Sequence, residues 1–158
     1  MPNWCEGVLK VRGAKENIVN FLQNGLEAVD FFGGDAGKHT VEIDKYDDIE
    51  IKDVNGWLHV KNTRRNFIDK ISHDLSLSKY SDDTFVCAID NFRAAWGIDA
   101  EALAKISKEY GIDLKIYAFE MGMQFNQDIE IVAGEVIKDD EIKFDNYDWE
   151  CINPFIGG

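Results

Sequence analysis

Apolar and polar residues alternate at the start of the chain, and the spacing then changes. Residues 7–13 alternate as in a short strand and end on a glycine. The next apolar positions are Ile18, Phe21, Leu22 and Leu26, at i, i+3, i+4 and i+8. That spacing places them on one face of a helix. The pattern therefore predicts one strand followed by one amphipathic helix.

Three short segments with strand-like alternation follow a glycine-rich break. They cover residues 41–43, 49–51 and 57–60. The pair Asn55-Gly56 precedes the third segment and is typical of a two-residue hairpin turn. We therefore expect a small antiparallel meander in this part of the chain.

A second amphipathic helix is expected after this meander. Thr63 can cap its first turn, and Phe67, Ile68, Ile71 and Leu75 would then lie on one side. The apolar run that follows a polar loop, residues 85–89, is typical of a buried strand.

The clearest helix signal in the chain begins at Asp99. This residue can cap the helix, Leu103 and Ile106 would face inward, and Gly111 stands where a helix commonly ends. We therefore predict a helix between Asp99 and Gly111.

The last third of the chain has four further strand-like segments. They are residues 114–118, 129–132, 135–138 and 142–144. Asp139 and Asp140 separate the last two segments, and adjacent aspartates are common in turns. We expect a four-stranded meander here.

The order of these elements favours an α+β domain. Tight turns between strands indicate a mainly antiparallel sheet, with about three helices packed on it. No internal repeat, low-complexity tract or Pro-rich linker is present. We therefore expect a single domain over residues 1–158.

Charge sets the first limit on partners. The chain carries −13, and residues 109–158 hold twelve acidic side chains against three lysines, a local charge of −9. A surface so negative repels nucleic acid and anionic lipid. We expect no direct nucleic-acid binding and the strongest negative field on the C-terminal third.

The N-terminal residues, the length of the apolar runs and the cysteines bear on the cellular compartment of the protein. The first residues do not form a basic and then apolar leader, and no apolar run approaches the roughly 18 residues of a membrane span. Cys5, Cys87 and Cys151 are scattered and fit neither a disulfide framework nor a zinc motif. We expect a cytoplasmic protein without membrane contact, with reduced and buried thiols.

Motifs for catalysis and cofactors are weak. The glycine-rich segment 33–40 has one residue too few for a phosphate-binding loop, and no histidine has a ligand partner at metal-site spacing. We therefore predict no cofactor, no metal and no enzyme activity. The alternative is a hydrolytic or metal-dependent enzyme that uses Glu120, Asp128 and Glu130, which could display carboxylates on one strand face.

Two other features bear on recognition. Lys61, Arg64, Arg65 and Lys70 form the one basic cluster, which we interpret as counter-charges to the acidic C-terminal meander; a partner or phosphate contact is the alternative. The four tryptophans lie in or beside predicted elements, so we expect at least two of them in the core. A cluster of exposed tryptophans would instead mark an interaction patch. The residues expected at an interaction surface are Lys61, Arg64, Arg65, Trp96, Glu120, Asn126, Asp128, Glu130, Asp139, Asp140 and Trp149.

Four motifs resemble a known family. They are Pro2-Asn3-Trp4-Cys5-Glu6-Gly7-x-Leu9-x-Val11-x-Gly13, then Ala94-Ala95-Trp96-Gly97, then Leu103-Ala104-Lys105-Ile106-Ser107-Lys108-Glu109-Tyr110, then Phe119-Glu120-Met121-Gly122-Met123-Gln124-Phe125. Together they are similar to the YubB-type, ferredoxin-like proteins of bacterial plasmids, phages and integrative elements. Residues 28–80 match nothing in that family and would be an elaboration of it.

The resemblance implies a ferredoxin-like fold without an iron–sulfur cluster, and an origin in a mobile genetic element. The family has no assigned reaction, so no catalytic residue is carried over. The leading hypothesis is an accessory protein that binds a protein partner without catalysis. The alternative, from the acidic C-terminal third, is a nucleic-acid mimic that inhibits a host DNA-processing or defence enzyme.

Overall fold

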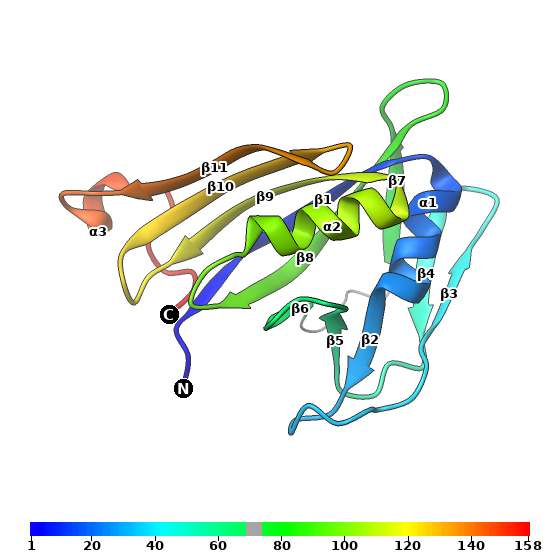
Figure 1. Cartoon of the computed structure of the whole chain (residues 1–158), viewed down its shortest axis with the longest axis horizontal. Coiled ribbons are helices and arrows are strands. Elements are labelled where there is room, and N and C mark those ends of the chain that lie inside the picture. The colour runs from blue at the N-terminus through cyan, green and yellow to red at the C-terminus, as the bar shows by residue number, and fades with distance from the viewer. Residues whose placement is uncertain (69–73) are drawn as a thin grey trace.

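A computed structural model describes residues 1–68 and 74–158 of the chain (Figure 1). It contains an eleven-stranded sheet, in which every described strand pair is antiparallel, and three short helices. The strands are β1 Trp4–Gly13, β2 Leu26–Val29, β3 Thr40–Ile43, β4 Asp48–Lys52, β5 Trp57–Val60, β6 Asn66–Ile68, β7 Asp74–Lys79, β8 Phe85–Ala95, β9 Ile112–Glu120, β10 Phe125–Val132 and β11 Glu135–Lys143. The helices are α1 Lys15–Asn20, continued by a π-helical turn Phe21–Gly25, then α2 Ala100–Tyr110 and α3 Tyr147–Glu150.

The sheet is built outward from β1, which lies between β8 and β9. On one side the order continues through β9 and β10 to β11 at the edge. On the other side the sheet forks, because the two ends of the long strand β8 have different partners. Ile68 of β6 pairs with Phe92, whereas Leu77 of β7 pairs with Cys87 and leads on to β4 and β3. Residues 28–80 are thus joined to the sheet through β8.

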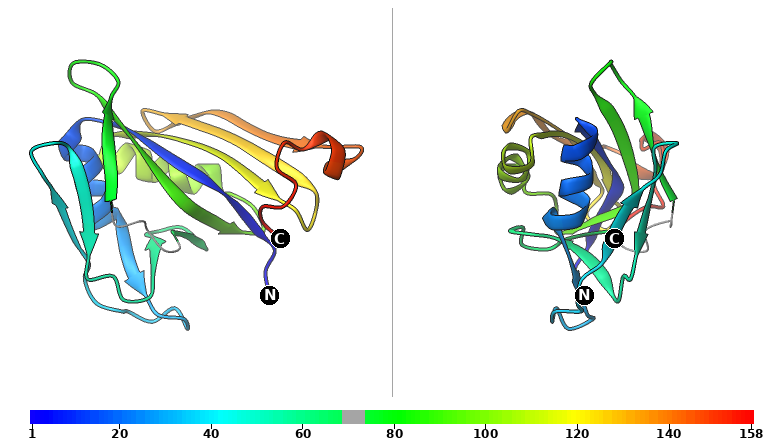
Figure 2. Two further views of the ribbon diagram at one scale, coloured as in Figure 1. Left: turned by 180° about the vertical axis from the view of Figure 1, so that it is seen from behind. Right: turned by 90° about the vertical axis from the view of Figure 1, so that its right-hand side faces the viewer.

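Both longer helices cover the same face of the sheet. The helix α2 packs on β9, β10 and β11, and α1 packs on β1 and β3. The alternation in the strands directs Leu9, Val11 and Ile116 toward this face, where they meet Leu103 and Ile106 of α2, and all five are buried. Seen from behind, the strands lie in front of α2 and their other face is open (Figure 2).

The expected ferredoxin-like α+β fold is wrong. Strands hold 48% of the chain and the three short helices only 17%, so the fold is dominated by its sheet. The main reason is the region after Thr63, where strands stand in place of the expected helix. The hydroxyl of Thr63 donates to the carbonyl of Val60 at 2.6 Å and caps no helix.

Pairing with β8 decides the structure of this region. Asn66–Ile68 and Asp74–Lys79 are strands β6 and β7, because the exposed backbone of β8 offers them partners that outweigh helical spacing. Ile71 and Lys70 lie outside the described residues.

Two hairpin predictions need correction. The β3–β4 hairpin is confirmed, but β5 pairs with β2 and β6 rather than with β4, so the meander of residues 41–60 is wrong. The last meander has three strands, not four, because Asp139 and Asp140 lie inside β11. As an edge strand, β11 leaves both aspartates exposed to water, so neither forces a turn.

The predicted helix between Asp99 and Gly111 is confirmed. The carboxylate of Asp99 accepts a hydrogen bond from the amide of Ala102 at 3.2 Å. Gly111 ends the helix in the left-handed region, at φ 63°. The first helix is confirmed for Ile18, Phe21 and Leu22, which are buried, but Leu26, expected on the same helix, begins strand β2.

The cap of α2 can be tested by substitution. Asp99→Ala removes the acceptor for a helix N-terminal amide and should lower the free energy of unfolding by about 1 kcal/mol in urea denaturation. Lys105→Ala, on the exposed side of the same helix, should change it by less than about 0.5 kcal/mol. Equal effects of the two changes would contradict a role for the cap.

Candidate functional site

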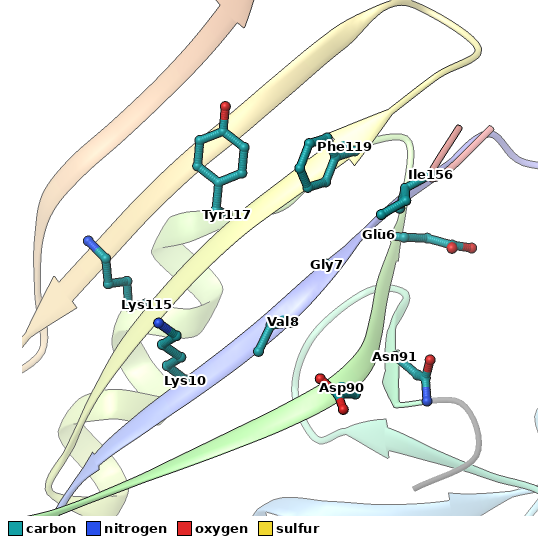
Figure 3. Close-up of a pocket in the computed structure, with 10 residues that line it drawn as sticks. All are labelled: Glu6, Gly7, Val8, Lys10, Asp90, Asn91, Lys115, Tyr117, Phe119 and Ile156. Carbon is teal, nitrogen blue, oxygen red and sulfur yellow. The ribbon is translucent and has the colours of Figure 1, made fainter. Parts of the chain in front are cut away.

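The open face of the sheet is hollowed where β1, β8 and β9 run side by side. The hollow has a volume of about 630 Å³ and is called the open-face hollow below. Figure 3 shows its lining side chains on the side of the sheet away from α2. Its apolar surface comes from Val8 of β1, Tyr117 and Phe119 of β9, and Ile156 of the C-terminal segment.

A β-bulge shapes the wall that β8 contributes. Gly7 pairs with Phe92 and Leu9 with Ile89, so β8 has one residue more than β1 over this stretch. Asn91 takes up the extra length with φ 62°. The bulge places both Asp90 and Asn91 at the hollow (Figure 3).

The charges at the hollow are of both signs. Lys10 and Lys115 lie together at one end, and Glu6 lies at the other (Figure 3). Lys115 is 3.2 Å from Glu130, and Glu6 is 3.1 Å from Arg93. The hollow therefore offers an apolar floor with mixed charges around it, which is typical of a recognition surface.

A row of aromatic rings continues from this hollow over the same face. The aromatic row consists of Phe32, Phe31, Trp57, Phe67 and Trp4, with successive ring centroids 5.5, 6.0, 5.9 and 6.0 Å apart. Trp4 lies two residues before Glu6 on β1, so both side chains are on the open face. Arg65 and Arg93 lie over the Trp4 ring, at 5.6 and 5.1 Å from its centroid.

The row becomes more exposed along its length. Trp4, Trp57 and Phe67 are half-buried, whereas Phe31 is 77% exposed and Phe32 93%. None of the four tryptophans belongs to the buried core, so the expectation of at least two core tryptophans is wrong. The reason is that Trp4 and Trp57 occupy strand positions on the uncovered face.

The carboxylates of the enzyme alternative do not converge. Asp128 pairs with Lys138 and Glu130 with Lys115, each across neighbouring strands. The hydrogen bond from Lys138 to Asp128 raises the pKa of the lysine. Glu120 is fully buried, and its two oxygens accept the amides of Gly122 and Met123 at 2.9 and 2.6 Å.

These carboxylates therefore hold strands and a turn together. Among residues 1–68 and 74–158 no cluster of three or more His, Cys, Asp or Glu side chains could hold a metal ion.

Asn126 anchors the C-terminal segment. Its side chain is buried, accepts a hydrogen bond from the hydroxyl of Tyr147 at 2.9 Å and donates to the hydroxyl of Tyr117 at 3.1 Å. Trp149 of α3 points outward and is 87% exposed. Asn126 thus has a structural position, and Trp149 lies on the surface.

Exposed acidic residues follow the β11 edge. The acidic edge consists of Glu135, Asp139, Asp140, Asp145 and Asp148. None of the five is within ion-pair distance of a cation in the described part of the chain. These five residues therefore display negative charge along one edge of the sheet, in the loop after it and in α3, and none of them lines a hollow among the described residues.

The basic cluster does not neutralise this edge. Among the described residues, Lys61, Arg64 and Arg65 form no ion pair, so they do not act as counter-charges; Lys70, the fourth member, lies outside the described residues. Arg64 and Arg65 instead line a second hollow of about 330 Å³ together with Trp96. Of the residues expected at an interaction surface, these three are brought together from separate segments.

Sequence reasoning missed the open-face hollow. Lys10, Tyr117 and Phe119 were not singled out, although period-two alternation places Lys10 on the same face as Val8 and Glu6. The sequence thus contains the alternation that places Lys10 on this face. It does not reveal that β1 pairs with both β8 and β9, and this pairing assembles the hollow.

Comparisons of the chain with protein-family models, with curated proteins and with solved structures found no match. The resemblance to the YubB-type proteins therefore stays a prediction. The fold is an open-faced antiparallel sheet with a hollow and an aromatic row on its uncovered face. No helix in the described part of the chain is long and apolar enough to cross a bilayer.

Cys5 and Cys87 should react very slowly with alkylating reagents in the folded protein. Burial raises the pKa of the Cys5 thiol and of the Cys87 thiol to about 12 from an ordinary value of 9.0, and the expectation of buried free thiols is confirmed. A rise of this size lowers the thiolate fraction at pH 8 about a thousandfold, so iodoacetamide should alkylate both thiols far more slowly than in urea.

Stability should also fall as the pH rises above 9. Thiols of the unfolded chain ionise near pH 9, whereas Cys5 and Cys87 stay protonated up to about pH 12 in the fold. Urea denaturation between pH 8 and 11 measures this loss. Rapid alkylation of the native protein at pH 8 would show that these thiols are accessible.

Proposed function

We propose that this chain is a non-catalytic accessory protein of a bacterial mobile genetic element, and that it binds a protein partner through the open face of its sheet. The observation that supports this most directly is the aromatic row beside the open-face hollow. The resemblance of the sequence to the YubB-type proteins supports the origin.

The composition of this surface suits protein recognition. Aromatic residues and arginine are enriched in protein interfaces and dominate their binding energy. Phe31 and Phe32 are adjacent and largely exposed, and their burial by a partner would contribute about 1.5–3 kcal/mol each. Trp4 and the two arginines over it provide a half-buried, rigid end to the same row.

The double variant Phe31→Ser/Phe32→Ser tests the proposal. Immobilised wild-type protein should retain a specific partner from bacterial lysate, and the affinity of that purified partner for the variant should fall at least about tenfold. Isothermal titration calorimetry measures the affinity, and circular dichroism checks that the variant folds.

The matched control is Tyr46→Ser. Tyr46 is also an exposed aromatic residue, at 73%, but it lies outside the aromatic row. Its variant should bind as the wild type does. Equal affinity of the double variant and the wild type, or the absence of any specific partner, would refute binding through this face.

A second candidate function rests on the acidic edge. A chain that displays unpaired carboxylates along an extended strand is suited to the basic groove of an enzyme that acts on nucleic acid. Asp139 and Asp140 are successive residues of β11, and the rise of about 3.4 Å per strand residue equals the axial charge spacing along one strand of B-DNA. The chain would then be an acidic mimic of nucleic acid that inhibits a host DNA-processing or defence enzyme.

The mimic predicts binding that depends on salt and on this edge. The variant Asp139→Asn/Asp140→Asn/Asp145→Asn should lose at least about tenfold in affinity for the captured partner at low salt. The same variant should also show a weaker decrease in affinity between about 50 and 200 mM salt. Calorimetry at several salt concentrations measures both.

An equal loss of charge elsewhere provides the control. The variant Asp53→Asn/Asp83→Asn/Glu109→Gln also removes three exposed negative charges. It should retain nearly the full affinity. If both variants weaken binding equally, net charge explains the effect and the mimic is rejected.

A further inference from the structure

The second hollow has walls from three parts of the chain. The turn before β6 contributes Arg64 and Arg65, and the first residue of β6 is Asn66. The loop between β8 and α2 contributes Trp96, and the far wall includes Glu141 of β11. Its volume of about 330 Å³ is in the range of small-ligand sites. It shares no lining residue with the open-face hollow.

Hydrogen bonds to Gln127 and Asn3 fix the backbone of the loop that carries Trp96. The side-chain amide of Gln127 accepts the backbone N–H of Ile98 at 2.8 Å and donates to the Ile98 carbonyl at 3.3 Å. The backbone N–H of Trp96 donates to the carbonyl of Asn3 at 2.9 Å. The indole is thereby presented on a fixed backbone while it remains 60% exposed.

The hollow contains a buried donor without an acceptor. Asn66 is only 4% exposed, and its Nδ2 has no hydrogen-bond partner among the described residues. An unsatisfied buried donor costs about 1–3 kcal/mol, so native proteins rarely leave one. Arg64 is exposed beside it and forms no ion pair with any described residue.

Each of the two carboxylates at the hollow, in contrast, already has a partner. Asp99 accepts the amide of Ala102 in the cap of α2, and Glu141 lies 3.2 Å from Lys143. The groups that remain unmatched are therefore donors and cations. A ligand that completes the hollow must supply an acceptor, and an anionic one pairs best with arginine.

We propose that this hollow binds a small ligand through an oxyanion, a carboxylate or a phosphate. Asn66 Nδ2 donates a hydrogen bond to the oxyanion, Arg64 and Arg65 balance its charge, and the remainder of the ligand packs against the Trp96 indole. The site has no lining residue in common with the open-face hollow, but it shares Arg65 with the aromatic row.

Benzoate and phenyl phosphate are suitable probes, because each carries an oxyanion on a ring that can pack on Trp96. Titration calorimetry at constant ionic strength should give saturable binding of at least one probe with a dissociation constant of about 1 mM or lower. Benzyl alcohol, which has the ring but no charge, should not bind. Binding of both probes indicates a general oxyanion site, and binding of one identifies the source of the oxyanion.

Variants locate the site. Arg64→Gln should weaken binding of the probe about tenfold. Asn66→Asp replaces the hydrogen-bond donor by a negative charge, which repels the oxyanion of the probe, and should abolish binding. Lys45→Gln removes an exposed cation elsewhere and should have no effect. The quenching of tryptophan fluorescence by the probe should disappear in Trp96→Phe.

Two results would overturn the proposal. One is the absence of saturable binding of either probe to the wild type. The other is unchanged binding in Arg64→Gln. Because Arg64 is exposed, that variant remains decisive even if Asn66→Asp fails to fold.

Discussion

The close approach of β1 to β9 is the constraint on which the sheet depends. Gly7 lies where the two strands meet, and a Cβ atom at this position would lie 2.2 Å from the carbonyl oxygen of Tyr117. No side chain fits there without separating the strands. Because β1 also pairs with β8, a glycine at this one position permits the central three strands, the core beneath them and the open-face hollow above them.

The same arrangement explains why the aromatic row lies on one face. The helices α1 and α2 bury the alternate residues of the strands on their side, and this leaves the opposite residues uncovered. On a covered face, Trp4 and Phe67 would be core residues. On the open face they form a row that remains partly in water, and a partner can complete its burial.

Local signals in the sequence predicted the elements that depend on few distant contacts. Asp99 and Gly111 set the ends of α2 through their own side chain and backbone, so the sequence sufficed. The region after Thr63 has helical spacing, but pairing with β8 determines its structure: Ile68 of β6 pairs with Phe92, and Leu77 of β7 pairs with Cys87. Likewise, the local sequence at Asp139 is typical of a turn, but Asp139 lies inside β11, where an edge strand leaves its side chain exposed to water. The candidate sites needed both kinds of information, since Trp96 and Arg64 meet only in the folded chain.

Strand β8 connects the two hollows physically. Its bulge at Asn91 forms a wall of the open-face hollow, and the loop after its last residue, Ala95, carries Trp96 into the second hollow. Asn91 and Trp96 both have positive φ, at 62° and 69°, which is unfavourable for a tryptophan. Such conformations persist only where the surrounding structure enforces them, and they are concentrated at functional sites. Both residues lie in the C-terminal half of β8 or directly after it, so this one stretch of the chain shapes a wall of each hollow.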